Sequence, residues 1–230
     1  MYLREIAVFA DENIVMRFPS GFVGWFHRET CCVTELYESF IQRKMATSDT
    51  AKVNLVLYDE EGFVPTVRQL INVADGRWSF DFASYAEKDE RGKKRMILDA
   101  LHAALLWIAK ERGWETEALN DAYSQILNRN LAFESLSKKT WFSSNRKYKA
   151  KVGFCYGVRA IHFFLVVYDR KGNELGRKPL EKVSPEMGVV HWVLKQKPVW
   201  NTHNVFRLRT DGYCFHLPKE LEVDLSDWVA

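Results

Sequence analysis

The clearest chemical signal in the sequence is a basic and aromatic segment in its second half. Residues 135–168 contain no aspartate or glutamate and carry +7, so the rest of the chain sums to −4 (+3 − 7). Basic side chains neutralise phosphates and aromatic rings stack on bases, which predicts a nucleic-acid surface within residues 138–159. The candidate contacts are Lys147, Lys149, Lys151, Trp141 and Tyr148.

Two other interpretations of this segment stay open. Lysines that alternate with apolar residues, as at 147–152, are typical of an edge strand that lysine protects from aggregation. The same positive field would also attract an acidic protein partner.

A second candidate surface lies in the segment RLRTDGYCFH, residues 207–216. A two-residue turn at Asp211-Gly212 would place Arg207 opposite His216, and Arg209 opposite Cys214, on one face of a hairpin. Two arginines could bind an anionic ligand or a carboxylate of a partner, and an arginine beside a thiol favours the thiolate. The alternative is an ordinary solvent-facing side of a sheet, with the cysteine as a small apolar side chain.

Cys31 is the other candidate nucleophile, with His27 and Glu29 just upstream. A helix that begins near residue 31, with Thr30 as its N-cap, would place this thiol in the first turn, where the helix dipole favours a thiolate. Cys32 would point toward the core and pack as an inert side chain. An enzyme with a reactive cysteine is therefore one hypothesis, and buried structural cysteines are the other.

Familiar catalytic and metal-binding motifs are absent from the sequence. The cysteines form no CxxC pair, and the histidines at 191, 203 and 216 form no HxH or HExxH motif. Phosphate-binding glycine loops and the GxSxG nucleophile elbow do not occur either. We therefore expect no cofactor and no metal, and we favour a non-catalytic protein over an enzyme.

Helical periodicity predicts helices at about 31–46, 94–112 and 116–133, with Gly113 ending the second of them. Strands are predicted in KVNLVLYDEEG, KYKAKVGFCYG, VRAIHFFLVVYDRKGNELG and VVHWVLK, and on both sides of residues 10–13. Asp75-Gly76 predicts a second tight hairpin, with Val73 opposite Trp78.

These elements predict an α+β fold, in which one or more antiparallel, hairpin-rich sheets are covered by the three helices. We expect a single domain over residues 1–230, or two closely packed halves that meet near 134–146. LVLYDEEG at 55–62 resembles LVVYDRKG at 165–172, which suggests a weak internal duplication; apolar strands that end in similar turns are the alternative.

Composition narrows the function only broadly. The apolar share of 47% is typical of a globular protein. Because the sequence shows no signal peptide, no long apolar span and no disulfide spacing, we expect a cytoplasmic protein. Our preferred hypothesis is a protein-binding module, such as one that neutralises a toxin. A nucleic-acid-binding protein is the first alternative and an enzyme with a reactive cysteine is the second; the sequence does not indicate the oligomeric state.

Overall fold

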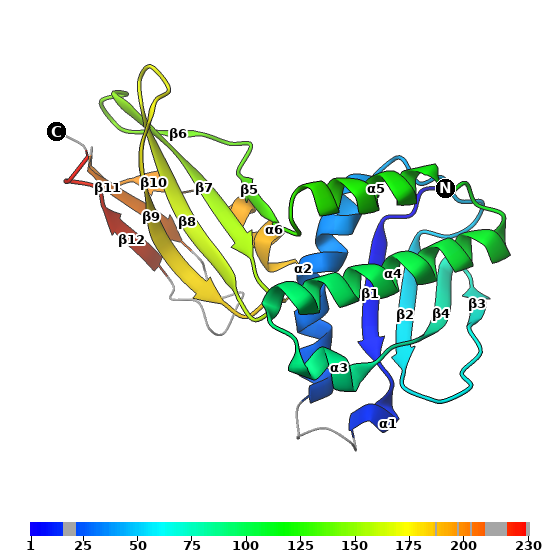
Figure 1. The fold of residues 1–230 in the computed structure, drawn as a ribbon. Helices are drawn as coiled ribbons and strands as arrows, with labels where there is room; N and C mark the ends of the chain where they lie inside the picture. The colour runs from blue at the N-terminus through cyan, green and yellow to red at the C-terminus, as the bar shows by residue number, and fades with distance from the viewer. Residues whose placement is uncertain (16–21, 187, 197, 203, 210–219, 229–230) are drawn as a thin grey trace. The chain divides into compact units, whose positions relative to one another are not determined.

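The fold is α+β, as predicted, and the chain divides into two compact units, Met1–Phe133 and Glu134–Ala230 (Figure 1). A computed structural model describes residues 1–15, 22–186, 188–196, 198–202, 204–209 and 220–228. Each unit is described by itself below.

The first unit contains a mixed sheet with the strand order β1-β2-β4-β3. Its strands are β1 (Glu5–Ala10), β2 (Lys52–Tyr58), β3 (Thr66–Leu70) and β4 (Val73–Ser79). β1 and β4 both pair with β2 in parallel, and β3 pairs with β4 antiparallel. Antiparallel pairing, as predicted for the sheets, therefore holds for β3 and β4, while the parallel pairing in the rest of this sheet was not predicted.

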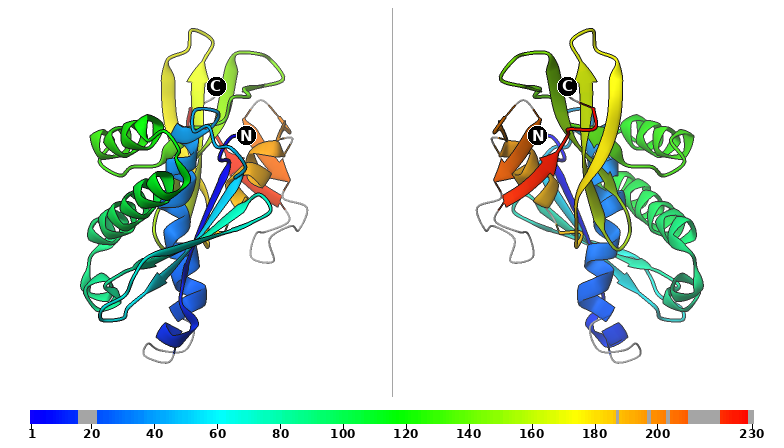
Figure 2. Two further views of the ribbon diagram at one scale, coloured as in Figure 1. Left: turned by 90° about the vertical axis from the view of Figure 1, so that its right-hand side faces the viewer. Right: turned by 90° about the vertical axis from the view of Figure 1, so that its left-hand side faces the viewer.

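Helices cover one face of this sheet. The long helices are α2 (Phe22–Ile41), α4 (Glu90–Arg112) and α5 (Glu117–Asn128), and the short ones are α1 (Glu12–Val15) and α3 (Phe82–Glu87). α2 packs along β1, α4 packs against β4, and α5 packs on both α2 and α4 (Figures 1 and 2). Gly113 ends α4 with φ +65, as predicted. Residues 14–15, where a second strand was expected to begin, belong to helix α1 instead.

The predicted start of the first long helix was wrong. α2 begins at Phe22 rather than near residue 31. Buried Phe26, Thr30, Val33 and Tyr37 share one spacing of three and four residues, so the helical pattern begins well before the predicted start. Thr30 therefore lies inside the helix and does not cap it.

The predicted turn at Asp75-Gly76 was also wrong, because both residues lie in the middle of β4. A Cβ on Gly76 would lie 2.8 Å from Ile108 Cδ1, so this glycine allows α4 to approach the sheet closely. The Asp75 carboxylate accepts a hydrogen bond from Asn54 Nδ2 at 2.8 Å. The chain reverses instead at residues 71–72, between the paired residues Leu70 and Val73.

Ile71 in this turn is both strained and exposed. Its φ is 54°, a left-handed conformation that β-branched residues rarely adopt, and 95% of its surface is accessible. We expect Ile71→Asn to raise the free energy of unfolding by about 1 kcal/mol, since asparagine tolerates this backbone conformation. Urea denaturation measures the change, and Ile71→Val, which keeps the branched Cβ, should give no gain.

The second unit contains two antiparallel sheets. The larger consists of β5 (Glu134–Leu136), β6 (Trp141–Phe142), β7 (Tyr148–Tyr156), β8 (Ile161–Asp169) and β9 (Glu174–Val183). The smaller has the order β10 (Val199–Trp200), β11 (Val205–Arg209) and β12 (Glu220–Asp224). β12 lies beside β9 and β10 lies beside β6.

The core of this unit includes the inner faces of both sheets. Phe206 and Leu208 of the smaller sheet are fully buried, as is Leu165 of the larger one. Trp200 Nε1 donates a hydrogen bond to the backbone oxygen of Trp141 at 3.1 Å, which joins β10 to β6. The segment VVHWVLK, predicted as a strand, forms helix α6 (Val189–Lys195), in which the buried valines have helical spacing.

The two similar YDxxG segments differ in topology. β2 pairs in parallel on both of its sides, whereas β8 pairs antiparallel on both. Gly62 and Gly172, which end the two segments, have φ angles of 73° and 98°. The common turn chemistry, rather than a duplication, therefore accounts for the resemblance.

Candidate functional site

Two turns of the larger sheet in the second unit lie at the same end of that sheet (Figures 1 and 2). One joins β6 to β7 and contains Arg146 and Lys147; the other joins β8 to β9 and contains Arg170 and Lys171. A hollow of about 390 Å³ lies between them, lined by Phe142, Asn145, Arg146, Lys147 and Arg170. We call this set the basic hollow.

Hydrogen bonds hold the β6–β7 turn in place. The buried Ser143 hydroxyl accepts from the Tyr148 backbone N–H at 3.1 Å and donates to Asn145 Oδ1 at 2.8 Å. The same Asn145 oxygen accepts the backbone N–H of Lys147 at 3.0 Å, and Arg146 takes a left-handed φ of 55°. The turn therefore presents its cations from an ordered backbone, which lowers the entropy cost of binding.

Positive charge is concentrated around the basic hollow. Residues 143–149 and 169–173 hold five cations and one acid, Asp169, for a sum of +4 (5 − 1). Hydrogen bonds from Asn173 hold the pKa of Asp169 below its usual value. Within the described ranges, none of the five cations forms an ion pair, so their field is not neutralised locally.

The outer face of β7 extends this positive surface. Phe142 pairs with Lys149 across β6 and β7, so their side chains share one face, and 58% of the Phe142 surface is accessible. The Lys149 ammonium reaches the β8–β9 turn, 3.5 Å from where a Cβ on Gly172 would lie. Lys151 follows on the same face, about 6.7 Å from Lys149 along the strand.

β7 is not an edge strand, which removes one interpretation of its lysines. It pairs with β8 along its whole length on one side, and with β5 and β6 on the other. Protection of an exposed edge therefore does not explain the presence of lysine at positions 149 and 151.

The predicted aromatic contacts are placed differently from the lysines. Trp141 pairs with buried Ala150 and packs edge-on against Phe206 at 6.4 Å, so its half-buried indole points to the inner side of the sheet. Tyr148 alternates with Lys149 and points to the inner side, where it is half-buried. The structure places Lys147 in the lining of the hollow and Lys149 on the same strand face as Phe142, but it does not place these two rings in the lining.

The predicted contacts did not include Phe142, Asn145 or Arg170, although the first two lie within the predicted segment 138–159. Phe142 follows Trp141 directly, and only the strand register shows which of the two rings is exposed. Arg170 lies just beyond the acid-free segment, in a turn that begins with Asp169. Asn145 had a weak signal as a turn residue between two strands.

The second predicted surface, around Arg207 and Arg209, has a different register from the one expected. β11 pairs with β12 so that Arg207 lies opposite Glu222 and Arg209 opposite Glu220. Arg207 Nε donates to Glu222 Oε2 at 2.5 Å, and on its other side β11 pairs with β10. The predicted pairing of Arg207 with His216 is therefore wrong, and residues 211–216, including His216 and Cys214, lie outside the described residues.

The predicted environment of Cys31 was wrong as well. The residue lies in the middle of α2 with 2% of its surface accessible, and its thiol donates to the His27 backbone oxygen at 3.4 Å. The unpaired N–H groups of a helix N-terminus, which would favour a thiolate, are absent at this described position. Burial raises the pKa of the neighbouring Cys32 thiol to about 12, which disfavours its thiolate at neutral pH.

Within the described ranges, histidine, cysteine, aspartate and glutamate side chains form no group of three or more that could hold a metal ion. None of the described helices combines the length and the apolar character that crossing a membrane requires. Comparisons with protein-family models, with curated proteins and with solved structures return no match to this chain.

Proposed function

We propose that the protein binds a single nucleic-acid strand through the basic hollow and the adjoining outer face of β7. The observation that carries this proposal is the combination of unneutralised cations with an exposed flat ring around one ordered hollow. Arginine and lysine neutralise phosphates, and an exposed phenylalanine offers a surface on which a base can stack. The volume of about 390 Å³ is in the range of small-ligand pockets, so it suits one nucleotide.

A single strand fits these groups better than a duplex does. Bases in a duplex are stacked on one another, so Phe142 could reach a base only in an unpaired strand. Lys147, Lys149 and Lys151 alternate along the chain, which gives phosphates a linear track that leads away from the hollow. Asn145 adds an amide donor that forms no hydrogen bond to other described residues and can reach a phosphate or a base edge.

The test is fluorescence anisotropy with labelled oligodeoxythymidine and oligouridine over a series of salt concentrations. Replacing Arg146, Lys147 and Arg170 together by glutamine should make the negative slope of log K against log salt shallower by about 2, since each lost phosphate contact removes about 0.7 from its magnitude. The matched control replaces Lys88, Arg91 and Lys110 of the first unit by glutamine, with the same loss of charge and no expected change in slope.

Phe142→Leu separates stacking from simple charge attraction. It keeps an apolar side chain and should weaken oligonucleotide binding about tenfold, because stacking contributes about 1–3 kcal/mol per base. Polyglutamate carries charge without bases, so its binding should not respond to this variant. Oligonucleotide binding that survives the triple substitution unchanged would refute the proposal.

A protein partner, as preferred from the sequence, is the second candidate function. The observation that favours it is the exposed apolar turn at Leu70 and Ile71, with accessible fractions of 60% and 95%. Apolar side chains at this exposure suit the pocket of another protein, including a toxin of the kind predicted. A stoichiometric partner that the natural chain retains and Ile71→Asn does not would support this function.

We also propose a cytoplasmic location, as the sequence led us to expect. Nucleic acids and reduced thiols are both found in that compartment.

A further inference from the structure

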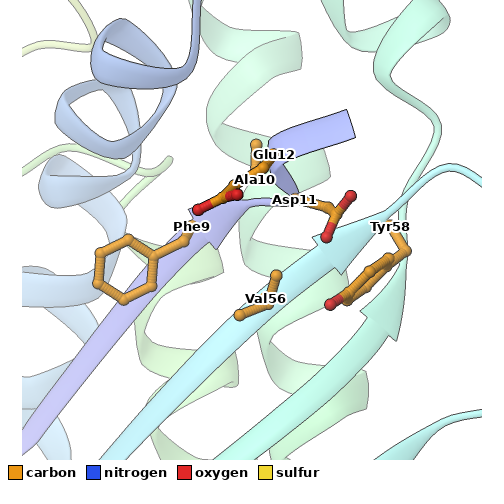
Figure 3. A pocket seen from close by; sticks show the side chains of 6 residues that line it. All are labelled: Phe9, Ala10, Asp11, Glu12, Val56 and Tyr58. Carbon is orange, nitrogen blue, oxygen red and sulfur yellow. The ribbon is translucent and has the colours of Figure 1, made fainter. Parts of the chain in front are cut away.

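A second hollow lies in the first unit, at the carboxyl ends of the parallel strands β1 and β2 (Figure 3). Its volume is about 400 Å³, and its lining residues are Phe9, Ala10, Asp11, Glu12, Val56 and Tyr58. Parallel strands direct their ends to the same edge of a sheet, and ligands of open α/β sheets bind at this edge. The position therefore has a physical precedent as a binding site.

Apolar side chains from both strands form the floor and one wall. Phe9 pairs with Val56, so the two side chains share the sheet face opposite α4. The Phe9 ring is fixed by stacking on His27, with ring centroids 4.7 Å apart. Figure 3 shows Val56 between the Phe9 ring and Tyr58.

Tyr58 is held so that its hydroxyl faces the hollow. Its ring stacks on Phe63 at 5.2 Å, and the Arg77 guanidinium lies 5.4 Å from the ring centroid. In Figure 3 the hydroxyl points from the end of β2 back toward Val56. Burial raises the pKa of this hydroxyl, and the nearby Asp11 carboxylate adds to the effect, so the group stays neutral.

Two carboxylates lie above this apolar floor. Asp11 follows β1 directly and is oriented by Asn13, whose backbone N–H and Nδ2 donate to Asp11 Oδ1 at 3.0 and 2.9 Å. Neither Asp11 nor the exposed Glu12 forms an ion pair with the residues that the structure describes. The lining therefore combines negative charge, one neutral hydroxyl and apolar walls.

We propose that this hollow binds an organic cation, a primary ammonium group on a short apolar stem. The carboxylates would pair with the ammonium, Tyr58 would accept one of its hydrogen bonds, and Phe9 and Val56 would cover the stem. A bare metal ion fits less well, because the apolar walls supply no oxygen ligands. The site is separate from the basic hollow and does not depend on the nucleic-acid proposal.

The test is a titration of the full, isotopically labelled chain with n-butylamine at neutral pH, followed by amide chemical shifts. The expected result is saturable shifts at residues 9–13 and 56–59 with the amine, and none with the neutral analogue 1-butanol. A short peptide with one central lysine is titrated in the same way, and its affinity is compared with that of butylamine. This comparison distinguishes a lysine side chain of a protein from a small amine as the natural ligand. Tighter binding of the peptide would assign the site to a protein partner, and equal binding to a small amine.

Asp11→Asn with Glu12→Gln should weaken butylamine binding at least about tenfold, while the amide oxygen introduced at position 11 can still accept the bonds from Asn13. Glu111→Gln with Glu115→Gln removes the same charge from exposed positions around the C-terminal end of α4 and should leave binding unchanged. No saturable shift with butylamine, equal shifts with 1-butanol, or equal weakening by the two double variants would each overturn the proposal.

Discussion

Replacing Lys93 by methionine is expected to lower the free energy of unfolding by about 3–5 kcal/mol, because it removes the ammonium that lies beside a buried carboxylate. Lys93 Nζ lies 3.2 Å from Glu29 Oε2, and both side chains are about 90% buried. The Tyr85 hydroxyl donates to the same oxygen at 2.6 Å, and the ammonium lies 4.8 Å from the Tyr85 ring centroid. This cluster joins α2, α3 and α4 inside the first unit.

The double variant Lys93→Met with Glu29→Gln is the matched control. It removes both charges, and the glutamine oxygen can still accept the Tyr85 hydrogen bond. Much of the lost stability should therefore return, since a buried ion pair contributes little relative to a neutral replacement of similar size. Urea denaturation of the three proteins decides the matter; equal losses in the single and double variants would show that packing, rather than the loss of the Lys93 ammonium, is the cause.

The position of α4 was predictable because several local features of its sequence agree with one another. The apolar period is sustained over several turns, and Gly113 adopts the left-handed conformation that ends the helix. The Asp89 side chain also caps the start, accepting from the Gly92 N–H at 2.7 Å. Such local signals do not depend on how distant strands pair.

Strand register was much harder to predict, because it depends on contacts between distant parts of the chain. Asp75-Gly76 has the composition of a tight turn, yet Gly76 is needed where Ile108 of α4 approaches the sheet. The turn falls at Ile71 instead, at a residue type that turn rules disfavour. Propensity was overridden here by helix packing and by parallel pairing of β4 with β2.

The same limit explains which parts of the candidate site were predictable. The acid-free segment and its lysines are local features of the sequence. Whether Trp141 or Phe142 faces solvent depends on the pairing of β6 with β7, and the approach of Arg170 depends on the β8–β9 turn. The positive charge of the site was therefore predictable from the sequence. The exposed ring of Phe142 and the β8–β9 turn, which complete the hollow, could be placed only from the fold.

Glu38 is expected to make the stability of the first unit depend on pH. It lies on α2 beside the edge strand β1, where its Oε1 accepts the Ile6 backbone N–H at 2.6 Å. This bond occupies an edge N–H that would otherwise be open to another strand. Burial is the main cause that raises the pKa of Glu38 from 4.5 to about 7, and the charges of Glu35 and Glu5 add to it.

The direction of this pH dependence follows from whether the folded or the unfolded state binds the Glu38 proton more tightly. Because the folded pKa is above the unfolded value, the folded protein holds more protons between 4.5 and about 7, and its stability falls as the pH rises through this window. The shift corresponds to at most about 3 kcal/mol, and partial solvent exposure of the half-buried side chain reduces this to about 2 kcal/mol.

Glu38→Gln should therefore stabilise the protein by about 2 kcal/mol near pH 8 and have little effect near pH 4, because the amide oxygen can still accept the Ile6 N–H and carries no charge. Urea denaturation across this pH range gives the difference directly. Glu115→Gln, which removes one charge from the exposed loop between α4 and α5, should show no such pH dependence. A gain from Glu38→Gln that is the same at both ends of the range would mean that the buried charge of Glu38 is not its cause.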